Sequence, residues 1–186
     1  MNLGHVLIFG GTGMLKEASR WISTHAEHTI IFGRNRDHLA SIKENFGNEQ
    51  LEVRELDYTD IISLENELKR AFITNGPIHM VVAWIHGTAP SAIPTIIEQI
   101  DQLQENLQWN LILIKGSSDN LSSITTPILS TRENCIIKEV KLGFIYDGNS
   151  SRWLTHQEIS SGTIQAIIEN KHSKIIGTLE PWDKRP

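Results

Sequence analysis

The first feature that could bind a ligand is a glycine-rich turn close to the start of the chain. An apolar run, His5–Phe9, leads into it, and a segment with helical spacing follows it. Glycines at such a junction let the backbone turn tightly and approach a pyrophosphate, which the amides of a helix N-terminus then bind. In this order, the pattern predicts a dinucleotide-binding turn made by Gly10, Gly11, Thr12, Gly13, Met14 and Leu15. A plain tight turn with no ligand is the alternative interpretation.

Further reactive side chains follow the later apolar runs. If those runs are parallel strands, their carboxyl ends meet at one edge of a sheet, where ligands gather. The side chains expected at that edge are His86, Ser117, Ser118, Tyr146, Asn149 and Arg152. His86 is the one whose ordinary pKa suits proton exchange near neutral pH. An ordinary loop histidine is the alternative for His86, and a capping serine is the alternative for Ser117.

Spacing argues against three other kinds of site. The chain has no Cys-x-x-Cys or His-x-x-x-His pair, so we expect no metal. Ser117 does not stand in a G-x-S-x-G elbow, which argues against a hydrolase triad. The glycine turn lacks the G-x-x-x-x-G-K-[ST] spacing of a P-loop, so ATP hydrolysis is not expected.

The elements that must position these residues alternate regularly along the chain. Short apolar runs predict strands at Val6–Phe9, Thr29–Phe32, Leu51–Leu56, Met80–Ile85, Leu111–Ile114, Cys135–Ile145 and Lys174–Leu179. Helical spacing of apolar residues separates them, and a capping box at Thr155–Glu158 opens the last helix. This alternation predicts a doubly wound, mostly parallel Rossmann sheet of order 3-2-1-4-5-6-7, with helices on both faces. We expect one domain over residues 1–186, with a tail at about 180–186.

Composition narrows the class of protein. The length of 186 residues suits one domain, and the formal charge of −5 disfavours binding to a nucleic-acid backbone. The single cysteine, Cys135, fits a reducing compartment. No apolar run approaches the roughly 20 residues that span a bilayer, and no basic leader precedes the first strand. We therefore expect a cytoplasmic protein without nucleic-acid or membrane partners. Trp182 in the polar tail predicts docking, on its own domain or on a second copy in a homo-oligomer.

Taken in order, the motifs resemble those of atypical and extended members of the short-chain dehydrogenase/reductase family. The matching segments are Gly10-x-x-Gly13, Gly33-Arg34-Asn35, Leu56-Asp57-Tyr58, Val82-Ala83-Trp84-Ile85, Lys115-Gly116-Ser117-Ser118 and Leu142-Gly143-Phe144-Ile145. The resemblance implies that Asp57 binds the adenine amino group and that Ser117 is the active-site serine. Beyond the glycine turn, it implies a cofactor site containing Arg34, Asn35, Arg36, Asp57, Tyr58, Ala83, Trp84, Ile85 and Ile145.

Two departures from the family pattern concern chemistry. Lys16 replaces the third glycine of G-x-x-G-x-x-G, and its side chain could point outward or reach a phosphate. The Tyr-x-x-x-Lys pair that serves the family as acid is absent between Gly116 and Cys135. The resemblance therefore implies an oxidoreductase that acts on an unknown small molecule, with a non-standard proton donor for which His86 and Ser117 are candidates. The alternative is a non-catalytic dinucleotide-binding redox sensor or regulatory protein.

The residues after the second expected strand bear on cofactor choice. Folds that prefer NAD place an acidic residue about 20 positions beyond the glycine motif, where it binds the ribose hydroxyls. Here that position is Gly33, and Arg34 and Arg36 follow it. A guanidinium can bind a 2′-phosphate with charge-assisted hydrogen bonds. This predicts NADP(H), with NAD(H) as second choice; ordinary surface arginines are the alternative.

Overall fold

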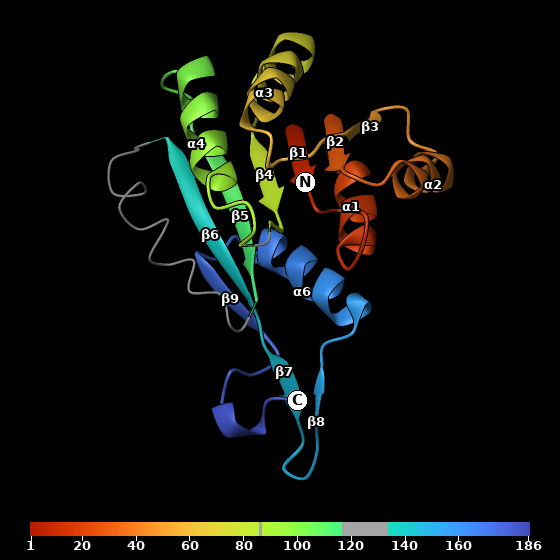
Figure 1. Ribbon diagram of the computed structural model, residues 1–186, viewed down its shortest axis with the longest axis vertical. Coiled ribbons are helices and arrows are strands. Elements are labelled where there is room, and N and C mark those ends of the chain that lie inside the picture. The colour runs from red at the N-terminus through yellow and green to blue at the C-terminus, as the bar shows by residue number, and fades with distance from the viewer. Residues whose placement is uncertain (86, 117–133) are drawn as a thin grey trace.

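The computed structural model describes residues 1–85, 87–116 and 134–186. Seven strands form one sheet in the order β3-β2-β1-β4-β5-β6-β9, and every neighbouring pair is parallel (Figure 1). This confirms the expected order, with β9 as the seventh strand. The strands are β1 (His5–Phe9), β2 (His28–Gly33), β3 (Leu51–Glu55), β4 (Met80–Ala83), β5 (Trp109–Lys115), β6 (Cys135–Leu142) and β9 (Ser173–Ile176).

Helices cover both faces of this sheet, as the alternation predicts. They are α1 (Lys16–Ser23), α2 (Arg36–Phe46), α3 (Ile61–Asn75), α4 (Ala92–Leu103) and α6 (His156–Glu169). Alternate strand residues point to opposite faces, so Leu7 and Phe9 pack with α3 and α4, whereas Val6 and Ile8 pack with α1, α2 and α6. Both faces are buried along the central strands β1, β2, β4 and β5, which explains why these strands have almost uninterrupted apolar sequences.

The expected strand Cys135–Ile145 is wrong as a single element. The chain leaves the sheet at Gly143, and β7 (Phe144–Tyr146) then pairs antiparallel with β8 (Ser151–Trp153) in a hairpin. Figure 1 shows this hairpin extending beyond the sheet. Gly143 runs so close to Thr178 that a Cβ would lie 2.0 Å from the Thr178 carbonyl oxygen. The strand therefore ends because of this tertiary contact with Thr178, which cannot be predicted from an apolar run in the sequence.

The tail docks on its own hairpin. Its short 3₁₀ turn, η1 (Trp182–Lys184), carries Trp182, and the guanidinium of Arg185 lies 4.3 Å from the centroid of that ring. The same guanidinium is 5.9 Å from the ring centroid of Trp153. Both indoles stay about half exposed. Within the part of the chain that the structure describes, no helix has the length and apolar character to cross a membrane.

The last helix, α6, begins as the capping box predicts. The Thr155 hydroxyl accepts the Glu158 amide at 3.2 Å, and the Glu158 carboxylate accepts the Thr155 amide at 2.8 Å. The helix then packs against α1. The Ser160 hydroxyl donates to the Met14 carbonyl at 2.8 Å, across 146 positions of sequence. The start of α6 is thereby held against the glycine turn.

Candidate functional site

The glycine turn is shaped by two close approaches and one opening. Gly10 has φ +78°, and a Cβ there would lie 2.5 Å from the carbonyl oxygen of Trp84. A larger residue would therefore push β1 away from the end of β4. At Gly13, by contrast, a Cβ would meet no atom within 4 Å. The side of the turn that faces the sheet is tightly packed at Gly10. The side at Gly13 is open, and a ligand could approach the backbone there.

The helix after the turn has an N-terminus suited to an anion. Leu15 is its N-cap and makes no side-chain capping hydrogen bond, and the Lys16 amide bonds to the Gly13 carbonyl at 2.9 Å. Uncapped amides at this end carry a partial positive charge that favours a bound anion. Lys16, the residue in place of the third glycine, is half-buried and lines neither of the two pockets that lie beside the turn.

A polar pocket of about 320 Å³ lies beside the turn. Its lining is Gly10, Thr12, Gly13, Met14, Gly33, Arg34, Tyr58, Trp84 and His156. The guanidinium of Arg34 lies 5.8 Å from the ring centroid of Tyr58, a cation–π distance. Arg34 is exposed and makes no ion pair with any described residue. Because no ion pair with a described residue neutralises this guanidinium, Arg34 can bind an anion at the edge of the pocket.

An apolar pocket of about 310 Å³ adjoins the polar one. It is lined by Met14, Trp84, Gly116, Leu142, Gly143, Trp153, Leu154 and Ile159. Met14 and Trp84 line both pockets, so the two spaces meet at these side chains. The combined site is polar beside the glycine turn and apolar beside the hairpin and the start of α6. A ligand that fits both parts must itself have a charged end and a ring-like or apolar end.

The structure separates the predicted cofactor residues into two groups. Those that line the polar pocket are Gly10, Thr12, Gly13, Met14, Arg34, Tyr58 and Trp84. Those that line neither pocket are Gly11, Leu15, Asn35, Arg36, Asp57, Ala83, Ile85 and Ile145. The side chains of Leu15, Ala83 and Ile85 are buried in the core.

Among the residues that line neither pocket, Asn35 and Arg36 have structural roles at the start of α2. Asn35 caps α2, because its side chain accepts the His38 amide at 2.9 Å. Arg36 forms an ion pair with Glu55 at the end of β3. This pair offsets the cost of a cation at the start of α2, where the helix dipole is positive.

Asp57 is exposed in the turn after β3. Its Oδ1 accepts the amide and hydroxyl of Thr59 at 3.0 and 2.8 Å. These hydrogen bonds, with the charge of Arg34, hold the pKa of Asp57 below its usual value. Asp57 is therefore an anion that keeps Oδ2 available as an acceptor.

The catalytic candidates, His86 and Ser117, lie outside the described residues. Among the residues that are described, no three His, Cys, Asp or Glu side chains gather as a metal site would require. Three lining residues were missed by sequence reasoning: His156, Leu154 and Ile159. The capping box located the start of α6 but carried no signal that this start lies against the glycine turn.

The charge network at the start of α6 gives a pH-dependent prediction. Arg152 donates to both Glu158 oxygens at 2.8 and 2.9 Å, and this pairing with the Thr155 hydrogen bonds lowers the pKa of Glu158 from 4.5 to about 2. Because the folded state lowers this pKa, the stabilisation is present above pH 4.5 and is lost as the pH falls towards 2. In Arg152→Ala, the pKa of Glu158 should rise towards 4.5 in a carboxyl NMR titration. Arg70→Ala, on α3, should leave it unchanged; equal values in all three proteins would contradict the pairing.

Known proteins resemble this chain in fold. No family model and no curated protein matches the chain in sequence. Many solved structures share its fold, and two of them illustrate the likeness. YwfH, an NADPH-dependent reductase involved in bacilysin biosynthesis, superposes with a TM-score of 0.73 at 14% identity, over 94% of this chain and 99% of that one. A short-chain dehydrogenase/reductase from Burkholderia phymatum in complex with NAD gives 0.71 at 8% identity, over 97% and 90%. The chain thus has the Rossmann fold found in these two proteins.

Proposed function

We propose that the chain binds NADP(H) across the two adjoining pockets and is an oxidoreductase of the short-chain dehydrogenase type. The observation that carries this proposal is the junction at Met14 and Trp84 of a polar pocket at a glycine turn with an apolar pocket. A nicotinamide dinucleotide has the same two-part character, with charged phosphates and a flat ring. Of the two structures of like fold, one is an NADPH-dependent reductase and the other is a complex with NAD, which supports the proposal.

The residues at the polar end fit the phosphates and the adenosine. The backbone from Thr12 to Leu15 and the uncapped end of α1 would hold the pyrophosphate, and the open space at Gly13 admits it. Arg34 would bind the 2′-phosphate. Tyr58 would flank the adenine. Asp57 Oδ2 would accept a hydrogen bond from the adenine amino group.

The residues at the apolar end would exclude water. Leu142, Leu154 and Ile159 line this pocket together with Met14 and Trp84, and no charged side chain of the described residues lines it. A nicotinamide cofactor supplies a hydride when it is bound. A dry pocket protects such chemistry from solvent and strengthens any hydrogen bond to the reacting oxygen.

His86 and Ser117 are proposed as the proton donors, because the chain lacks the Tyr-x-x-x-Lys pair. Positioned general acids typically contribute about 10²- to 10⁴-fold to rate. We therefore expect little reduction of standard carbonyl substrates, and a further loss of roughly 100-fold in His86→Ala or Ser117→Ala wherever turnover is found. NADPH oxidation followed at 340 nm measures this, with Tyr146→Phe as a control. Turnover that survives the double substitution would show that neither residue is the donor.

A non-catalytic role is the second candidate. The observation that favours it is the missing Tyr-x-x-x-Lys pair, which removes the family's acid while the glycine turn remains. A redox sensor needs only the binding half of the site. It would bind NADPH and NADP⁺ with different affinities and show no turnover with any carbonyl compound.

Cofactor choice is tested by paired titration of NADPH and NADH. We expect NADPH to bind more tightly, because Arg34 has no ion-pair partner in the described chain. Arg34→Ala should weaken NADPH binding by roughly 10- to 100-fold, the worth of a charge-assisted hydrogen bond, and NADH binding by about twofold at most. Arg36→Ala is the matched control, since Arg36 already pairs with Glu55. Equal affinity of the parent protein for both cofactors would reject the role of Arg34.

A further inference from the structure

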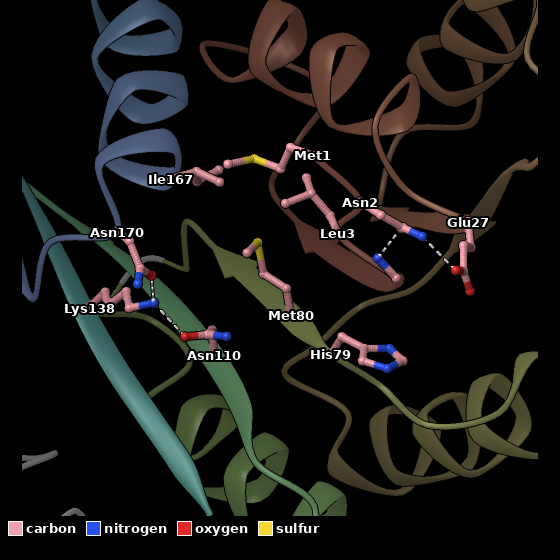
Figure 2. A pocket seen from close by; sticks show the side chains of 11 residues that line it. Met1, Asn2, Leu3, Glu27, His79, Met80, Asn110, Lys138, Ile167 and Asn170 are labelled. Carbon is pink, nitrogen blue, oxygen red and sulfur yellow. Dashed lines mark hydrogen bonds between the residues drawn. The ribbon is translucent and has the colours of Figure 1, made fainter.

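A second cavity, of about 570 Å³, lies at the edge of the sheet opposite to the glycine turn. Its apolar walls come from segments far apart in the sequence: Leu3 before β1, Met80 at the start of β4 and Ile167 in α6. Figure 2 shows these side chains around the same space as Lys138 and Asn110. The cavity is therefore built by the tertiary fold, and it shares no residue with the cofactor pockets.

The polar part of this cavity is a buried lysine without a counter-charge. Lys138, on β6, is only 7% exposed. Its ammonium donates to the side-chain oxygens of Asn110 and Asn170, which are neutral, and it makes no ion pair with any carboxylate of the described residues. Burial lowers the pKa of Lys138. A buried charge that meets only neutral acceptors is costly, so an anion beside it would be stabilising.

The two asparagines extend this positive site. An ammonium can only donate, so Asn110 and Asn170 must each turn the carbonyl oxygen towards it and the NH₂ group away. In Figure 2, the Asn110 nitrogen points away from Lys138. Lys138 itself has three N–H donors, and the two asparagines account for two of them. The cluster thus offers one unused ammonium N–H and amide donors, which is a set of partners for acceptor oxygens.

The cavity also limits the charge and shape of its ligand. Glu27 lies on the side away from Lys138, where the Asn2 amide donates to it at 2.6 Å (Figure 2). One buried cation with a carboxylate across the cavity suits a single negative charge better than a dianion. Beyond the two asparagines on Lys138, the cavity is lined by the apolar side chains of Leu3, Met80 and Ile167. A carboxylate with an apolar tail satisfies both parts.

We propose that this cavity binds a small monocarboxylate, with its carboxylate on Lys138 and its apolar tail on Leu3, Met80 and Ile167. The simpler interpretation is that Lys138 only neutralises the C-terminal end of α6, whose C-cap is Asn170. That role accounts for the charge but needs neither the third N–H nor a cavity with apolar walls. The site is independent of the cofactor site, because the six residue-to-residue steps from Gly4 to Gly10 span roughly 20 Å of strand.

The test uses hexanoate as the probe and the intact protein. Calorimetric titration should show saturable binding in the millimolar range or tighter. In methyl NMR spectra, signals of Leu3, Met80 and Ile167 should shift on titration, while Met14 and Leu154 in the cofactor pockets should not. Saturating NADPH should not displace hexanoate. No saturation, or shifts confined to the cofactor pockets, would overturn the proposal.

Variants and other ligands separate the parts of the proposal. Lys138→Met keeps an unbranched side chain that is one heavy atom shorter and removes its charge, so hexanoate affinity should fall at least tenfold. Lys171→Met, the same change at an exposed lysine, should bind as the parent does. Acetate and inorganic phosphate should bind at least tenfold more weakly than hexanoate. Equal binding of all three anions, or unchanged affinity in a folded Lys138→Met, would show that no such carboxylate site exists; the methyl shifts of the parent decide the matter if that variant fails to fold.

Discussion

Replacing Gly13 with aspartate should abolish dinucleotide binding and leave the fold intact. A Cβ at Gly13 meets no atom of the described residues within 4 Å, and the Gly13 backbone is outside the left-handed region, so we expect the substitution to introduce neither a clash nor backbone strain. A carboxylate near the uncapped start of α1 even interacts favourably with the helix dipole, by about 0.3–1 kcal/mol. The same carboxylate occupies the place proposed for the pyrophosphate. Like charges at close range cost several kcal/mol, so we expect NADPH affinity to fall by roughly 100-fold or more.

Thermal unfolding and fluorescence titration of NADPH measure the two effects separately. Gly13→Ala is the matched control, because it fills the same space without charge and should weaken binding by less than Gly13→Asp. If Gly13→Asp binds NADPH as the parent does, the glycine turn does not hold a pyrophosphate. The proposed monocarboxylate cavity would be untouched by that result, since hexanoate binding should be the same in both variants.

Replacing Gly143 with alanine should have the largest effect on stability. A Cβ at this position would lie 2.0 Å from the Thr178 carbonyl oxygen, and the contact is with backbone, which cannot rotate away. Two hydrogen bonds close this junction, from the Phe144 amide to the Thr178 oxygen at 3.0 Å and back from the Thr178 amide at 2.8 Å. Overpacking and loss of these bonds should together cost about 3 kcal/mol.

The measurement is urea or thermal unfolding, where a loss of this size should lower the melting temperature by roughly 6–12 °C. Gly87→Ala is the control, since a Cβ there meets nothing within 4 Å and its φ is not positive. It should change stability by less than about 0.5 kcal/mol. Because Gly143 also lines the apolar pocket, Gly143→Ala should perturb that pocket as well. A melting temperature equal to that of Gly87→Ala would mean that the β6–β7 junction is not tightly packed.

Local sequence pattern determined the frame of this protein. Short β-branched runs separated by helical spacing leave few topologies for a chain of this length, because parallel strands need helical crossovers of one hand. Together with the glycine turn after the first expected strand, that rule predicts a Rossmann order, in which β1 lies in the middle of the sheet with the turn at its carboxyl end. It also brought Arg34 and Tyr58 towards the turn, since both follow strands that neighbour β1 or its partner. The capping box at Thr155 set the start of α6 because its hydrogen bonds span only three residues.

Tertiary structure alone decided what surrounds that frame. The start of α6 faces the glycine turn through the hydrogen bond from Ser160 to Met14, and no local pattern encodes a partner 146 positions away. The exit of the chain at Gly143 depends on the backbone of Thr178, 35 residues later, and the sequence pattern there is that of a continuing strand. The local sequence shows Lys138 only as one polar residue in a strand. In the folded protein it is buried, and the end of α6 brings the neutral side chain of Asn170 to its ammonium, with no carboxylate of the described residues beside it. Each of these contacts forms when elements pack, and packing depends on side-chain volumes from several elements at once, which no single stretch of sequence contains.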